Sequence, residues 1–203
     1  MPELITLFLT GLIVSFLGSV PPGTINVTAM QLALAGDKRS AYSFSIAASI
    51  VEFFYAIIAV NFQLLLTKNT VINSKFQIIT AFALVIIGLY NFFQKASNSS
   101  TKKLVQGGFG KGILLGIANP LCIPFWLGIT AYLQSNDLIT IVGWNYMSYA
   151  LGISLGTLFL LIFVIRLTRL FEKYRNNTLI VYKIPGVIFT IMGIYTFYNW
   201  AAQ

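Results

Sequence analysis

The chain has 203 residues, 57% hydrophobic and 9% charged, with a net charge of +8. A soluble domain carries about 25% charged residues, so this composition predicts an integral membrane protein, and charges confined to short loops between apolar runs argue against nucleic-acid binding. The absence of histidine excludes histidine metal ligands and Ser-His-Asp triads, and the single cysteine, Cys122, excludes an internal disulfide.

Six apolar runs predict six membrane-spanning helices, because about 20 helical residues cross a hydrocarbon core of about 30 Å. No Lys or Arg precedes the first run, so we expect a retained span rather than a cleaved signal peptide. We therefore expect an all-α membrane protein with one transmembrane domain over residues 1–203. The predicted spans are residues 4–36, 41–66, 76–94, 111–133, 143–166 and 182–200.

The first span is cut by Pro21-Pro22-Gly23. Proline removes a backbone donor and clashes with the carbonyl four residues back, so this motif predicts a broken helix. The half-helix that starts at Thr24 would offer the free N–H groups of Thr24 and Ile25 and a positive dipole end, which suit a carboxylate. Asn26 adds a polar group there. A purely architectural kink is the alternative.

Glu52 is the only charged side chain inside a long apolar run. A carboxylate at the middle of a membrane helix costs about 2.5–3.5 kcal/mol on insertion scales, and such residues usually bind a solute or carry protons. The alternative is a structural hydrogen bond made by a neutral carboxyl. Pro22 and Glu52 lie at similar predicted depths, about 21 Å and about 18 Å from the inner ends of their spans.

The second span has two contrasting faces, which predict the direction of Glu52. Small or polar residues share its face, so Glu52 is expected to point into the bundle, because small residues let helices approach closely. They are Ser45, Ala48, Ser49, Ala56 and Ala59. The residues expected to face lipid are Ile46, Ile50, Phe53, Phe54 and Ile57.

The fourth span carries Asn119-Pro120, which predicts a second break or kink. Asn119 would supply hydrogen bonds from this side of the site, although proline kinks without a function are frequent in membrane helices. Nearby, Trp126 is predicted to be an interfacial anchor and Cys122 an inert packing residue. Tyr55, close to Glu52 in the second span, is predicted to be a packing residue.

Lys/Arg counting predicts the orientation. With both termini outside, the first, third and fifth loops are cytoplasmic and hold 11 of the 13 cations. We therefore expect a multi-pass protein of the bacterial plasma (inner) membrane, with both termini outside. The outer exceptions are Lys68 and Lys75.

The two halves of the chain share patterns that predict an internal repeat. Ile-x-Gly-x-Tyr-x-Phe occurs at residues 86–92 and 191–197, and the broken segments at 18–22 and 116–120 also correspond. Repeat one would cover about 1–94 and repeat two about 111–203, with a polar cytoplasmic loop at about 95–110. Repeats of three spans must be inverted, an architecture typical of transporters, although chance similarity is the alternative.

The motif Gly-x-x-Pro-Pro-Gly at 18–23, an acid in the second span, and Asn119-Pro120 followed by Phe125-Trp126 resemble the LysE/RhtB translocators, the lysine and homoserine/threonine exporters. The resemblance covers essentially the whole chain. It implies proton-coupled efflux of amino acids or similar metabolites from the cytoplasm. Thr24, Glu52 and Leu121 stand where that family usually has Pro, Asp and Lys.

The expected function is secondary export, with Glu52 binding the amino group of the solute or exchanging the solute for a proton. No enzymatic activity, cofactor or metal site is expected, while small-residue faces are compatible with a homodimer. A divalent-cation exporter and a non-transporting assembly protein are the alternatives. The expected binding residues are Pro21, Pro22, Gly23, Thr24, Ile25, Asn26, Glu52, Asn119 and Pro120.

Overall fold

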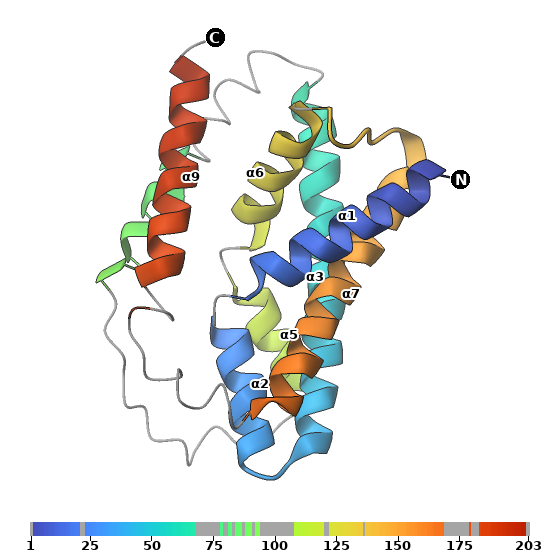
Figure 1. Ribbon diagram of the computed structural model, residues 1–203, viewed down its shortest axis with the longest axis vertical. Helices are drawn as coiled ribbons and strands as arrows, with labels where there is room; N and C mark the ends of the chain where they lie inside the picture. The colour runs from blue at the N-terminus through green and yellow to red at the C-terminus, as the bar shows by residue number, and fades with distance from the viewer. Residues whose placement is uncertain are drawn as a thin grey trace.

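The computed structural model is all-α in the part of the chain that it describes, with no strand among those residues (Figure 1). It describes residues 2–20, 23–67, 108–119, 122–135, 137–168 and 183–201, and also 78, 81–82, 84–86, 88–90, 92–93 and 179. The helices are α1 (Pro2–Gly18), α2 (Thr24–Leu34), α3 (Lys38–Thr67), α5 (Phe109–Ile117), α6 (Cys122–Ser135), the 3-10 turn η2 (Gly143–Asn145), α7 (Tyr146–Arg166) and α9 (Ile184–Ala201).

Two described helical stretches are long and apolar enough to cross a membrane by themselves. They are Lys38–Gln63, with 26 residues, and Gly143–Arg166, with 24 residues. The bent pair α5 and α6 makes a third if it counts as one span. The described parts of α1, α2 and α9 are shorter apolar helices, and much of the predicted third span lies outside the described residues. The count of six spans therefore stays a prediction.

The expected interruption of the first span is present. α1 ends at Gly18, and the backbone N–H groups of Ser19 and Val20 donate to Ser15 and Leu17 as the last turn tightens. The chain resumes a helical course at Thr24, after an extended Gly23. Pro21 and Pro22 lie outside the described residues, so the break is defined by the helix ends on either side of them.

The fourth span is interrupted as well. α5 ends at Ile117, and α6 begins at Cys122 with a bend of 66° between the two axes. α5 begins at Phe109, two residues earlier than the predicted start of the span. Asn119 directly precedes the interruption, whereas Pro120 lies outside the described residues.

The core is built on the antiparallel pair α3 and α7, with α1 lying obliquely along α7 (Figure 1). Glycines let the α1 and α7 backbones approach closely, because a Cβ at Gly152 would meet the carbonyl of Phe8 and one at Gly156 would meet that of Leu12. The buried hydroxyls of Ser15 and Thr157 share a hydrogen bond of 2.8 Å across the same contact. Any residue larger than glycine at these two positions would push α1 and α7 apart, so the contact requires glycine there.

α5 packs along α3 in a similar way. A Cβ at Gly112 would meet the carbonyl of Phe44, and one at Gly116 would lie 3.0 Å from the Val51 side chain. α9 lies further from this core, beside the described part of the segment 81–93 (Figure 1). Its ring contact with α6 joins Tyr132 and Tyr195, with centroids 6.4 Å apart.

The faces of α3 follow the predicted pattern with one correction. The small and polar residues around Glu52 are buried as expected, and Ile46, Ile50 and Phe54 are exposed, as residues expected to face lipid should be. Phe53 and Ile57, however, pack against the core cluster. They were expected to face lipid, but α3 contacts α5, α6 and α7, so its buried arc is wider than one face.

Candidate functional site

Glu52 lies at the centre of α3, 14 residues after Lys38 and 15 before Thr67. Both of its carboxylate oxygens accept hydrogen bonds from α6. The indole Nε1 of Trp126 donates to Oε1 at 2.5 Å, and the thiol Sγ of Cys122 donates to Oε2 at 3.3 Å. The carboxylate therefore points into the bundle, as the pattern of small residues on α3 predicted.

The roles predicted for Trp126 and Cys122 were wrong. Trp126 is 1% exposed in the core rather than anchored at the membrane interface, and the Cys122 thiol donates to the half-buried Glu52. The interfacial role was assigned because it is the commonest one for tryptophan. Their spacing was an available signal, because residues four apart on a helix share one face, here directly after the break.

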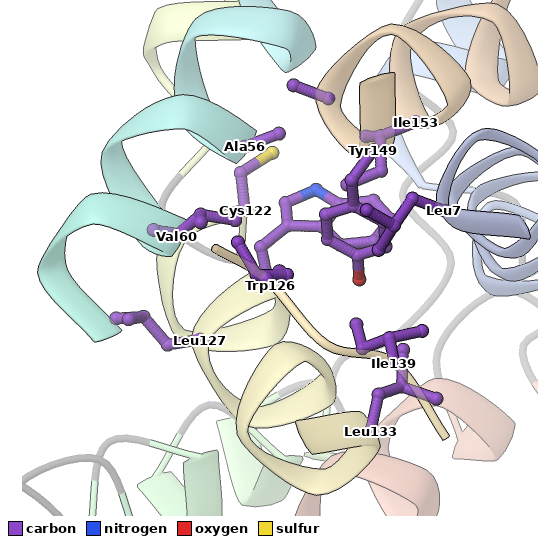
Figure 2. Close-up of a cluster of buried hydrophobic side chains, with 13 residues drawn as sticks. Leu7, Ala56, Val60, Cys122, Trp126, Leu127, Leu133, Ile139, Tyr149 and Ile153 are labelled. Atoms are coloured by element: carbon purple, nitrogen blue, oxygen red, sulfur yellow. The ribbon is translucent and has the colours of Figure 1, made fainter. Parts of the chain in front are cut away.

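The surroundings of the Trp126 indole, which donates to Glu52, are apolar (Figure 2). Trp126 lies between Cys122 and Tyr149, with Leu7, Val60 and further aliphatic side chains around it. Such surroundings strengthen the hydrogen bond from Trp126 to Glu52, because little water reaches the buried indole. They also make an uncompensated charge costly.

Tyr55 ties α3 to the second break. Its hydroxyl donates to the carbonyl of Ile117 at 2.7 Å, and Ile117 is the last residue of α5. Carbonyls in the last turn of a helix lack an intrahelical partner, so a side-chain donor satisfies one of them. Tyr55 was predicted to be a packing residue, so the structure corrects that role. Glu52 and Tyr55 thus contact opposite sides of the break, α6 and α5.

Replacing Tyr55 with Phe should loosen this break without disturbing the core. We expect a loss of about 1 kcal/mol of stability, the usual net value of one hydrogen bond. We also expect slower transport, since the Ile117 carbonyl loses its donor beside the site. Thermal unfolding and solute flux in proteoliposomes measure the two effects. The matched control is Tyr198→Phe, an exposed tyrosine on α9, and equal behaviour of both variants would contradict the role of Tyr55.

The first break lies against the same region. Gly18, the last residue of α1, faces the ring of Phe125, and a Cβ there would lie 2.7 Å from its Cζ. The rings of Phe125 and Trp126 pack edge to face, with their centroids 4.9 Å apart. Both interruptions and the carboxylate of Glu52 therefore meet around the start of α6.

The residues predicted to bind a solute at the first break have several environments. Asn26 donates its side-chain amide to the carbonyl of Ser19 at 2.6 Å, so it joins the two half-helices. Gly23 is the N-cap of α2 and supplies no side-chain cap, which leaves the first turn at Thr24 and Ile25 to other acceptors. Thr24 is exposed, while Ile25 and Asn119 are half-buried.

The described residues contain no group of three or more His, Cys, Asp or Glu side chains that could hold a metal ion. Hard divalent cations prefer six to eight oxygen ligands, and Glu52 brings one carboxylate with a thiol and an indole beside it.

A family model described as LysE type translocator matches residues 16–199, which include both breaks, Glu52, Cys122 and Trp126. The chain belongs to the LysE type translocator family. The resemblance inferred from the sequence is thereby confirmed, and this LysE type translocator is a membrane transport protein. Comparison with curated proteins and with solved structures finds no match.

Proposed function

We propose that this LysE type translocator exports amino acids or closely related small metabolites in exchange for protons, with Glu52 as the group that binds both. The observation that carries the proposal is the carboxylate at the centre of α3, bonded to α6 and adjacent to two helix interruptions. A lone acid at this depth is expected to serve a solute or a proton. Interrupted helices at membrane depth are typical of transporter binding sites.

An amino acid has two charges that match the two ends of this site. The N-terminus of α2 carries a positive dipole end without a side-chain cap, which suits the solute carboxylate. Glu52 suits the ammonium group, and Asn119 lies at the second break, where it adds a polar side chain. The zwitterion would bridge the two interruptions.

Proton exchange follows from competition for one carboxylate. An uncompensated charge is costly at the middle of a membrane helix, so a proton and a bound ammonium group are alternative ways to compensate the carboxylate. Arrival of a proton therefore promotes release of the solute, and arrival of the solute promotes release of the proton. One acid is enough for this coupling. The second half of the chain has no acid at the position equivalent to Glu52.

The packing of equivalent residues supports two inverted repeats. Gly88 lies against Thr190, and Gly193 lies against Val85. Aligning Gly88 with Gly193 also aligns Val85 with Thr190. Exchanging the two repeats therefore converts one contact into the other, as expected for repeats related by a two-fold axis. In the same way, α1 of the first half packs along α7, while α5 of the second half packs along α3.

The distribution of cations supports an inner-membrane orientation with both termini outside. Each cation in the described residues lies near a helix end: Lys38, Arg39, Lys111, Arg166 and Lys183. Figure 1 shows the start of α3 and the end of α7 together at the lower end of the bundle, away from both chain termini. Cytoplasmic ends are the ones that carry Lys and Arg.

Counterflow in proteoliposomes tests the proposal. Vesicles loaded with one unlabelled amino acid at a time should take up the same labelled amino acid faster than protein-free vesicles do. Exchange of at least one amino acid is expected. No exchange of any amino acid, together with efflux of a divalent cation, would replace the proposal with the cation exporter.

A further inference from the structure

α6 is joined to α3 by two hydrogen bonds that share one acceptor group. Trp126 and Cys122, four residues apart on α6, each hold a different oxygen of Glu52. The surrounding contact between the helices involves Ala56, Val60 and other apolar side chains. Apolar contacts have no directional requirement, so the carboxylate supplies the directional restraint on α6.

α5 is held to α3 in a different way. Gly112 and Gly116 bring its backbone against Phe44 and Val51, and Tyr55 holds its last carbonyl. None of these contacts involves the carboxylate of Glu52. Because the chain bends by 66° between α5 and α6, a change at the carboxylate can move α6 while α5 stays in place.

The two donors are neutral groups, so they leave the negative charge of an ionised Glu52 uncompensated. An ammonium group supplies both hydrogen bonds and a compensating charge, and charge-assisted pairs are about twice as strong as neutral ones. We propose that Trp126 and Cys122 are positioning residues that hold α6 on α3 in the empty transporter, and that a solute ammonium group releases α6 by taking over the same oxygens. The second half of this inference rests on the proposed function.

Alkylation of Cys122 by N-ethylmaleimide tests the restraint, because Cys122 is the only cysteine of the chain and is 6% exposed. We expect Trp126→Phe to speed the alkylation of Cys122 about tenfold or more, because α6 loses its hydrogen bond to Glu52. A tenfold factor corresponds to the loss of one hydrogen bond to a charged group. Asn61→Ala is the matched control on α3. The Asn61 amide donates to the Ile57 carbonyl of its own helix at 2.9 Å, so its loss should leave the rate unchanged.

A double-mutant cycle separates the restraint from a simple loss of indole volume. In a Glu52→Ala background, Trp126→Phe should give no further acceleration, because the shared acceptor is already absent. The same factor in both backgrounds would overturn the proposal, since a packing defect does not depend on Glu52. Circular dichroism of each variant establishes that the helices are intact.

The solute half is tested with whichever amino acid shows counterflow. That amino acid should accelerate alkylation of the wild-type chain and leave the Glu52→Ala variant unaffected. If counterflow occurs and Trp126→Phe leaves the rate unchanged, the restraint is wrong and the proposed function stands. If Trp126→Phe accelerates alkylation and no amino acid is exchanged, the restraint stands and the solute class is wrong.

Discussion

Replacing Glu52 with Gln is expected to abolish proton-coupled efflux, with a loss of about a hundredfold or more in the initial rate. Gln has nearly the same size and can still accept the Trp126 hydrogen bond, but it carries neither a charge for an ammonium group nor an exchangeable acidic proton. Removing one partner of a buried charge pair usually costs about 2–5 kcal/mol. Efflux driven by an imposed pH gradient in vesicles is the measurement.

Glu3→Gln is the matched control for this loss of charge, because Glu3 is an exposed acid in the first turn of α1. Its efflux should equal that of the wild type. Glu52→Asp should retain part of the activity, since it keeps the carboxylate charge on a shorter side chain. Full efflux by Glu52→Gln would remove Glu52 from the mechanism, whatever the solute.

The second large effect is expected at Gly152, where α7 contacts α1. An added Cβ would meet the backbone carbonyl of Phe8, and neither backbone can move aside as a flexible side chain would. Overpacking of this kind typically costs about 1–3 kcal/mol for a small addition. We therefore expect Gly152→Ala to lower the thermal unfolding midpoint clearly and Gly152→Leu to prevent stable folding.

Gly110→Ala provides the comparison. Gly110 also lies in a helix, but a Cβ there would meet nothing within 4 Å. This variant should be neutral or slightly stabilised, because alanine restricts the unfolded chain more than glycine does. Thermal unfolding followed by circular dichroism in detergent compares the two, and equal midpoints would show that α1 and α7 are not in close contact.

Local physical chemistry made the two breaks and the central position of Glu52 in its helix predictable. Proline and glycine act on the backbone of their own helix, so the ends of α1 and α5 could be placed within a few residues. The inward direction of Glu52 followed from the spacing of small residues along α3. The family could also be inferred from these motifs, because they lie in short contiguous stretches.

The partners of Glu52 could not be predicted in this way. Trp126 and Cys122 lie 74 and 70 residues away from it along the chain, and Tyr55 lies 62 residues from Ile117. The four-residue spacing of Cys122 and Trp126 indicates only that they share one face of α6, and it does not identify the acid on another helix to which they donate. The wide buried arc of α3, which covers Phe53 and Ile57, likewise depends on how many helices pack around it.

The amino-acid sequence alone determined that this is an all-helical membrane protein with one acid at the middle of a long apolar helix and with interrupted helices, because hydropathy, charge and proline act along a single helix. The tertiary structure decided which groups hold that acid and which half-helix they come from. Hydrogen bonds between helices depend on the packing that brings distant residues to within about 3 Å, and at Glu52 that packing puts α6 on both oxygens.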